Sequence, residues 1–272
     1  AASRITHRIR LAPLVLILPL YHPLRVASEI CMLDHLSKGR LDIGLGRGIS
    51  PYELAYFNVN HLESREIFEE AHQVLMDALT RDVVNFRGNH FKFFNVPIEL
   101  KPLQPRLPMW YPCSSPEGAR TAAQKGMHTC FLAPAARARV MADAYKQAWA
   151  ESGGGAAMPK VAITRHIYVA ENEAEARRRG IEAHKAWYQR FGYLWAKFDP
   201  RIPAEYDPDR HLATGTLIFG TPESVGARIA EELEATGANY FVTRFAFGDL
   251  RHEESLRSVE LFTREVMPLF RR

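Results

Sequence analysis

The sequence predicts an α/β fold in which parallel strands alternate with helices, as in a (β/α)8 barrel. Short apolar runs alternate with segments of helical periodicity along the whole chain. The 272 residues are close to the length of one barrel, roughly 250 residues. No G-x-G-x-x-G turn links a strand to a helix, so the alternative, an open doubly wound sheet, is less favoured.

The first predicted elements lie in residues 9–45. Residues 9–18 are nearly all apolar, which is typical of a strand buried on both faces, although Pro13 predicts a local irregularity there. Apolar residues recur at helical spacing over 24–37, and Gly39 can close that helix in a left-handed conformation. Residues 41–45 form a short apolar strand that leads into further glycines.

The next elements are two helices, a hairpin and a strand. Residues 63–80 have a clear apolar face and predict an amphipathic helix. Two strand-like runs flank an Arg-Gly-Asn turn within 83–96, which predicts a surface hairpin. A strand is expected at 109–113, and a helix at 116–125 is closed by Gly126.

The alternation continues through the second half of the chain. Strands are expected at 127–132 and 160–170, with a helix at 135–151 between them. A helix rich in aromatic residues runs from 171 to about 194. Three prolines predict that 197–215 is irregular.

The last elements complete a count of about six buried strands. Thr221-Pro222-Glu223 opens a helix that reaches about residue 235, a strand follows at 239–245, and the last helix spans 252–270. No change of composition follows the three glycines at 153–155, so residues 1–272 are interpreted as a single domain.

Composition excludes several classes of protein. Hydrophobic residues make up 47% and charged residues 24%, as in globular domains. A net charge of +4 without a basic stripe argues against nucleic-acid binding. Three cysteines without a C-x-x-C pair argue against a disulfide framework or a metal site, and favour the cytoplasm. The longest apolar stretch, 11–21, contains two prolines and is too short to span a membrane.

Glycines and an arginine follow the strand at 41–45. Because the carboxyl ends of parallel strands form the working face of such folds, ligand binding is expected there. Glycines let the backbone approach a ligand closely, and the guanidinium of Arg47 suits a phosphate. The alternative is a tight turn whose arginine forms a surface salt bridge, and the pattern alone does not decide between them.

A helix start follows the strand at 109–113. Ser114-Ser115-Pro116-Glu117 has the residues of a helix cap, and the N–H groups of such a start can bind a phosphate. Ordinary capping is the commoner explanation, because similar Ser-Pro and Thr-Pro starts recur at 50–53 and 221–223. His22, at another strand end, is a candidate for acid–base chemistry.

Several motifs, taken in order, resemble the bacterial luciferase-like flavin-dependent monooxygenases. The strongest are LPLYHPLR at 18–25, LDHLSKGR at 33–40 and GLGRG at 44–48. Further support comes from SPYE, KPLQ, SSPE and GTPESV, at residues 50–53, 101–104, 114–117 and 220–225. The resemblance covers essentially the whole chain, and the order of the motifs is more specific than any one of them.

The resemblance implies a (β/α)8 barrel with insertions that binds reduced FMN, or in some branches the deazaflavin F420. The cofactor-binding residues that it implies are Leu14, Val15, Arg47, Cys113, Ser114, Ser115 and Glu117. Of these, Arg47 and the helix start at Ser114 and Ser115 match positions that contact the flavin phosphate. A non-prolyl cis peptide bond, against which the flavin ring packs, would fall near Leu14 and Val15.

The activity implied is that of an oxidoreductase. Reduced FMN from a separate flavin reductase, together with O2, would oxygenate a small, apolar organic substrate in a cytoplasmic homodimer. Residues expected in the substrate pocket are Tyr21, Trp110, Phe245 and Phe247. Two alternatives stay open: an F420-dependent reductase or dehydrogenase of the same fold, and a non-catalytic flavin-binding or partner subunit.

The sequence departs from this family at its start. Family members begin with two further βα units, and the second carries a catalytic histidine in a segment that nothing here matches. The six strands would then be strands three to eight of an incomplete, N-terminally truncated barrel. His22 is only a weak substitute for that histidine, and the open side of such a barrel would need a partner to cover it.

Overall fold

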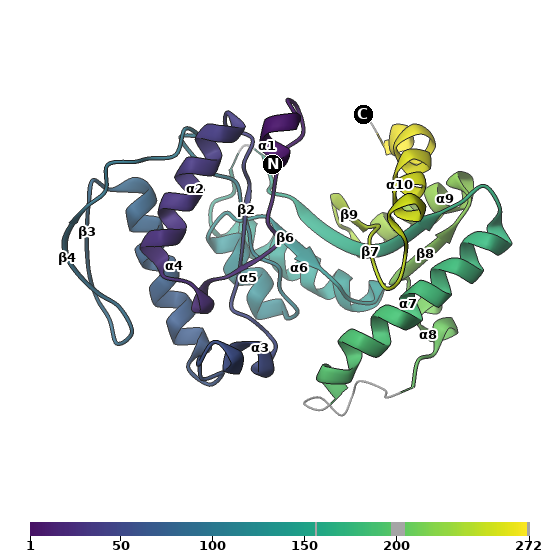
Figure 1. The fold of residues 1–272 in the computed structure, drawn as a ribbon, viewed down its shortest axis with the longest axis horizontal. Helices are drawn as coiled ribbons and strands as arrows, with labels where there is room; N and C mark the ends of the chain where they lie inside the picture. The colour runs from purple at the N-terminus through teal and green to yellow at the C-terminus, as the bar shows by residue number, and fades with distance from the viewer. Residues whose placement is uncertain (156, 197–204, 271–272) are drawn as a thin grey trace. The chain divides into compact units, whose positions relative to one another are not determined.

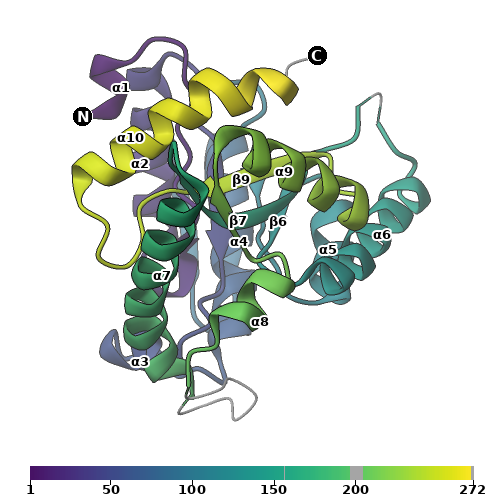
Figure 2. The same ribbon diagram turned by 90° about the vertical axis from the view of Figure 1, so that its right-hand side faces the viewer.

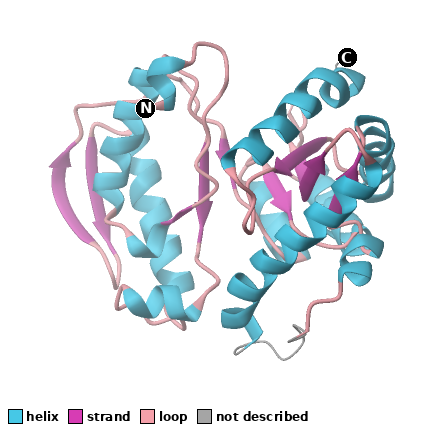
Figure 3. Cartoon of the chain, turned by 45° about the vertical axis from the view of Figure 1, so that its right-hand side comes forward, coloured by secondary structure: helices cyan, strands magenta, loops and turns pink. Residues whose placement is uncertain are grey.

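The computed structural model describes residues 1–155, 157–196 and 205–270 (Figure 1). The chain divides into two compact units, Ala1–Pro112 and Cys113–Arg272, which are described separately. Parallel strands and helices alternate in both units (Figure 3), which confirms the predicted α/β class. The interpretation of residues 1–272 as one domain stays a prediction.

The first unit contains a three-stranded parallel sheet. Its strands are β1 (Leu16–Ile17), β2 (Ile43–Gly46) and β5 (Met109–Trp110), in the order β1-β2-β5. The strand expected at 9–18 is much shorter than predicted, and its pairing is extended by an isolated bridge between Leu11 and Leu41 and by a hydrogen bond from the Gly44 N–H to the Pro13 carbonyl. Pro13, which has no N–H to donate, lies in the interrupted part.

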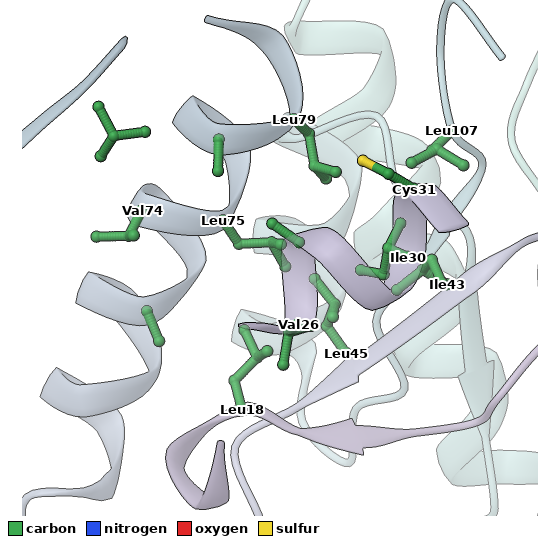
Figure 4. Close-up of a cluster of buried hydrophobic side chains, with 14 of the residues drawn as sticks. Leu18, Val26, Ile30, Cys31, Ile43, Leu45, Val74, Leu75, Leu79 and Leu107 are labelled. Atoms are coloured by element: carbon green, nitrogen blue, oxygen red, sulfur yellow. The ribbon is translucent and has the colours of Figure 1, made fainter. Parts of the chain in front are cut away.

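Helices and a hairpin complete the first unit. Its helices are α1 (Ala2–Ile5), α2 (Pro23–Ser37), α3 (Pro51–Tyr56) and α4 (Ser64–Thr80). The expected hairpin is confirmed as β3 (Val83–Arg87) and β4 (Lys92–Pro97). Apolar side chains of α2 and α4 pack against those of the sheet, as Figure 4 shows for Val26, Ile30, Leu45 and Leu75.

A carboxylate of α4 holds the turn of the β3–β4 hairpin. Glu70 accepts hydrogen bonds from the backbone N–H groups of Asn89, His90 and Phe91, at 2.7, 2.9 and 3.1 Å. Burial tends to raise the pKa of Glu70, but these donors outweigh it and the pKa is lowered. A Cβ on Gly88 would lie 2.3 Å from the Glu70 carboxyl carbon, so a larger residue there would displace the Glu70 carboxylate from the turn.

We expect Glu70→Ala to lower the free energy of unfolding by about 1–2 kcal/mol, because three backbone donors lose a charged acceptor. Urea denaturation measures the loss, and hydrogen exchange should speed up at the amides of residues 89–91. Glu69→Ala is the matched control, because Glu69 is exposed on the same helix. Equal losses for the two variants would contradict the role of Glu70.

The second unit contains a four-stranded sheet centred on β7 (Val161–Val169). This strand pairs in parallel with β6 (Thr129–Phe131), β8 (Leu217–Gly220) and β9 (Tyr240–Arg244). Each of its nine residues is buried. β8 was not predicted, because its four residues lie between an irregular stretch and a helix cap and show no period of their own. The described residues therefore hold seven parallel strands, not six.

Six α-helices are described in the second unit. They are α5 (Pro116–Gln124), α6 (Ala135–Glu151), α7 (Glu173–Ala196), α8 (Pro208–Ala213), α9 (Pro222–Thr236) and α10 (His252–Leu261). Helices α5 and α6 pack side by side (Figure 2). No helix in the described ranges combines the length and the apolar character needed to cross a bilayer.

Two helix predictions in this unit need correction. Part of the segment expected to be irregular, 197–215, forms α8, whose start is capped by Asp207 with proline at the first helical position. The prolines were interpreted as loop signals, although one of them is a helix start. The last helix was expected over 252–270, but α10 ends at Leu261 and a π-helical turn (Phe262–Val266) and a 3-10 turn (Met267–Phe270) follow.

Candidate functional site

The glycines at the end of β2 allow a neighbouring chain segment to approach closely. A Cβ on Gly44 would lie 2.5 Å from Cδ2 of Leu14, and a Cβ on Gly46 would lie 2.6 Å from Cγ2 of Val15. The peptide bond between Leu14 and Val15 is cis, as the resemblance implied. Within the first unit, these two cofactor candidates therefore lie against the glycine strand that leads to Arg47.

Arg47 directly follows β2 and is half-buried. Its guanidinium forms no ion pair or hydrogen bond with any residue that the structure describes. Two nearby arginines of this unit are engaged: Arg10 bonds the Asp42 carboxylate at 2.6 Å, and Arg40 bonds several backbone carbonyls. The salt bridge considered as the alternative role of Arg47 thus has no partner among the described residues.

The start of α5 is capped as the sequence predicts. The Ser115 hydroxyl accepts a hydrogen bond from the Gly118 N–H at 3.2 Å, and Pro116 occupies the first helical position. A Cβ on Gly118 would lie 2.7 Å from the Cβ of Cys113, so the glycine lets Cys113 pack against the helix start. Burial raises the pKa of the Cys113 thiol, which keeps the thiol uncharged near neutral pH.

A carboxylate and an arginine already lie at this helix start. The Glu117 carboxylate is held by its own backbone N–H and by the Ser115 hydroxyl, which lowers its pKa. The carbonyl of the exposed Ser114 accepts a hydrogen bond from Arg137 at 2.7 Å. The position is therefore suited to an anion, and an incoming phosphate would have to displace the Glu117 side chain.

A cavity of about 560 Å³ lies within the second unit and is here called the second-unit cavity. Its walls come from the segment after β6, from β7, from α7, and from residues in and around α8. The lining residues are Leu132, Pro134, His166, His184, Trp187, Tyr188, Phe191, Gly192, Glu205, Asp207, Arg210, His211, Thr214 and Thr216. The volume falls in the usual range for small-molecule sites.

Three histidines gather at one wall of this cavity. The ring centroid of His184 lies 4.9 Å from that of His166 and 5.1 Å from that of His211. Nδ1 of His184 is 3.0 Å from the Tyr206 hydroxyl oxygen, within hydrogen-bond distance. Nε2 of His166 is buried and has no hydrogen-bond partner among the described residues.

The histidines are neutral at ordinary pH. Burial is the largest cause that lowers the pKa of His166, to about 2, and interactions with His184, Arg244 and His211 lower it further. Burial and His211 lower the pKa of His184 to about 3. Burial also lowers the pKa of His211. No cluster of three or more metal-ligating side chains occurs among the described residues.

None of the four predicted substrate-pocket residues lines the second-unit cavity. Trp110 is buried in the first unit, and its indole N–H donates to Asp42 at 3.1 Å, while Tyr21 of that unit is exposed. Phe245 packs edge-to-face on Phe262. Phe247 is buried, and its ring centroid lies 5.0 Å from that of the lining residue His166. Their role in a substrate pocket stays a prediction.

The candidate acid–base residue His22 lies against the hairpin. Its ring packs edge-to-face on Phe93 at 5.6 Å and on Phe91 at 6.3 Å. The histidines of the cavity were missed, because a histidine inside a strand is more often structural, His184 lies in a helix noted only for its aromatic residues, and His211 lies in a segment predicted to be irregular. A histidine inside an otherwise apolar strand was the one available signal.

Comparison with known proteins identifies close sequence and structural relatives. A family profile described as "Luciferase-like monooxygenase" matches residues 1–240. An uncharacterized protein, y4wF of Sinorhizobium fredii strain NBRC 101917 / NGR234, is 34% identical over 96% of this chain and 78% of its own length.

Solved structures of similar fold include monooxygenase RslO1 from Streptomyces bottropensis. It is 26% identical, with a TM-score of 0.87 over 99% of this chain and 81% of its own. The oxygenating constituent of 3,6-diketocamphane monooxygenase from Pseudomonas putida, in complex with FMN, is 21% identical. Its TM-score is 0.79, over 98% of this chain and 81% of its own. Coenzyme F420-dependent tetrahydromethanopterin reductase from Methanopyrus kandleri is 21% identical. Its TM-score is 0.75, over 99% of this chain and 86% of its own. The chain thus has an α/β fold that matches luciferase-like TIM-barrel structures.

Proposed function

The chain belongs to the luciferase-like monooxygenase family, and from this premise we propose that it is a flavin-dependent monooxygenase. Its reaction would use reduced FMN and O2 to oxygenate a small, mostly apolar organic substrate. The observation that carries the proposal is the half-buried guanidinium of Arg47, which has no partner in the described parts of the chain. An unpaired, partly desolvated cation beside a glycine-rich strand end is suited to a phosphate ester.

The residues proposed to hold the cofactor have separate tasks. Arg47, in the first unit, is proposed to bind the phosphate by charge. In the second unit, the backbone N–H groups at the α5 start, at Ser114 and Ser115, are assigned to the cofactor by the resemblance alone. Leu14 and Val15 offer an apolar surface to the ring, because Leu14 is 44% exposed. Cys113 and Glu117 are assigned to the same cofactor by the resemblance alone.

When bound, reduced FMN supplies the electrons that activate O2. The protein's part is to hold the flavin, exclude water and orient the substrate. His22 is the weak candidate for moving a proton, since its ring already packs against Phe91 and Phe93. A separate flavin reductase would supply the reduced cofactor, and a homodimer is the assembly that we propose.

The proposal is tested by titrating the chain with FMN, riboflavin and F420, and by measuring O2 uptake with chemically reduced FMN and aldehydes or terpenes. FMN bound more tightly than F420, with substrate-dependent O2 uptake, is the expected result. Preference for F420 would favour the reductase or dehydrogenase alternative, whose likeness to the F420-dependent reductase rests on fold alone. Binding without any turnover would favour a non-catalytic partner subunit, and no flavin binding would refute the proposal.

We expect Arg47→Ala to weaken FMN binding by about 10- to 100-fold, because a charge-assisted phosphate contact contributes roughly 1.5–3 kcal/mol. Riboflavin, which has no phosphate, should lose less than about twofold. Quenching of flavin fluorescence measures both affinities. Equal losses for the two flavins would contradict a phosphate role for Arg47.

Two further variants sharpen this test. Arg25→Ala is the matched control, because Arg25 is an exposed arginine of the same unit that, among the described residues, pairs with Glu29 alone, at 2.9 Å. It should leave both flavin affinities unchanged. Glu117→Gln removes the negative charge at the α5 start, so it should leave FMN affinity unchanged or strengthen it a few-fold.

A further inference from the structure

We propose that the second-unit cavity is a binding pocket for a cyclic, mostly apolar and uncharged compound that carries one ketone or hydroxyl oxygen. Nε2 of His166 would be the hydrogen-bond partner of that oxygen. The proposal deepens the proposed function, because it names a substrate class for the oxygenation. It rests on that function only for the role of the ligand as a substrate, since binding to the cavity requires no flavin.

The shape and lining of the cavity favour a ring compound. On α7, the rings of Trp187 and Phe191 stack at 4.9 Å and 16°, and so present adjoining aromatic surfaces. Leu132 and Pro134, after β6, add aliphatic surface to the lining. Aromatic and aliphatic walls of this kind bind flat or bulky apolar rings through dispersion and desolvation.

One polar atom of the lining lacks a partner. His166 is 2% exposed, and an unpaired polar atom at such burial costs about 1–3 kcal/mol. His184, also in the lining, differs because its Nδ1 lies beside the Tyr206 hydroxyl. Of the buried side-chain atoms without a partner in the described chain, Nε2 of His166 is the one that belongs to a cavity-lining residue. Because this atom is itself covered, a ligand oxygen would satisfy it after the imidazole ring turns toward the cavity.

The charges around the cavity favour an uncharged ligand. The histidine wall is neutral, so it carries no formal charge to pair with a carboxylate or an ammonium group. Among the described lining residues, the acidic and basic side chains Glu205, Asp207 and Arg210 are all exposed. A neutral ketone or hydroxyl matches a neutral imidazole, which can either donate or accept according to its tautomer.

The test compares two probes of the same shape, 2-tetralone and its hydrocarbon counterpart tetralin. Binding to the flavin-free chain is measured by quenching of tryptophan fluorescence, because Trp187 is in the lining. We expect the ketone to bind about tenfold more tightly than the hydrocarbon, the effect of one hydrogen bond to a buried group. Equal affinities, or no binding of either probe, would overturn the proposal while leaving a flavin-binding result intact.

Variants assign the difference to His166. His166→Phe keeps an aromatic ring but removes the hydrogen bond, so the ketone should lose its tenfold advantage while tetralin binding changes little. His166→Gln, which restores a polar group, should recover part of the advantage and serves if the phenylalanine variant does not fold. His252→Phe, at an exposed histidine of the same unit, is the control and should bind both probes as the unaltered chain does. A tenfold advantage that persists in His166→Phe would refute the role of His166.

Discussion

Replacing Glu232 with glutamine is expected to lower the free energy of unfolding by about 3–5 kcal/mol, because it leaves the guanidinium of Arg165 buried without a counter-charge. Arg165 is 0% exposed on β7, and Glu232 is 3% exposed on α9. The pair ties the central strand of the second unit to the helix that packs beside it. Urea denaturation, monitored by circular dichroism, measures the loss.

The geometry of this pair explains the size of the effect. Glu232 Oε2 accepts from Nη2 of Arg165 at 2.6 Å and from Nε at 3.0 Å, and the remaining nitrogen, Nη1, donates to the Thr164 carbonyl. The second carboxylate oxygen lies 3.3 Å from Arg228. A Cβ on Gly215 would lie 2.0 Å from that oxygen, so the carboxylate packs directly against the Gly215 backbone.

Two comparisons separate the buried charge from the general effect of a substitution on α9. Glu231→Gln should cost less than about 1 kcal/mol, because Glu231 pairs with Arg228 at the surface. The double variant Arg165→Met, Glu232→Leu removes both charges, and it should recover most of the stability that Glu232→Gln loses. A double variant that is less stable than Glu232→Gln would show that the pair itself, and not the orphaned charge, is the source of stability.

The elements with a strong local pattern could be predicted from the sequence. The amphipathic helix Ser64–Thr80 and the capped helices that begin at Pro116 and Pro222 lie where apolar spacing and Ser-Pro or Thr-Pro starts place them. The failures are short elements. Leu217–Gly220 forms a strand because β7 offers it free backbone groups to pair with, and four residues carry no periodicity that would show this beforehand.

The site candidates divide in the same way. The glycines and Arg47 follow a strand in sequence, so their common location could be predicted, and so could the Ser115 cap. The second-unit cavity could not be predicted, because its histidines come from a strand and two helices that only the folded chain brings together. The neutral state of His166 depends on that burial, which no local motif encodes.

Acid is expected to destabilise this chain from about pH 6.5 downward, because His166 and His184 are held in their neutral form. Both pKa values lie far below the ordinary value of 6.5, at about 2 and about 3. The unfolded chain therefore binds protons in a range where the folded chain does not. The contribution of the two neutral histidines to the free energy of unfolding is fully present above pH 6.5. It is lost as the pH falls from 6.5 toward their pKa values in the folded chain.

The size of the loss follows from the number of protons. Each histidine that must stay neutral costs about 1.4 kcal/mol per pH unit below its unfolded pKa, so two cost about 2–3 kcal/mol between pH 6 and pH 5. Burial is the largest cause of the lowered pKa of His166, and His184 on α7, Arg244 on β9 and His211 on α8 each lower it further. His211, whose pKa is also lowered, adds to the loss.

Urea denaturation at pH 7.5, 6 and 5 measures this dependence. His166→Phe and His184→Leu should each reduce the loss between pH 6 and pH 5 by about 1 kcal/mol, because one proton fewer is taken up on unfolding. Their stability at pH 7.5 can change through packing without affecting the comparison, since the slope and not the absolute value carries the prediction. His252→Gln, at an exposed histidine of the same unit, should leave the slope unchanged. Unaltered slopes in both cavity variants would mean that these two imidazoles gain protons in the folded chain as readily as in the unfolded one.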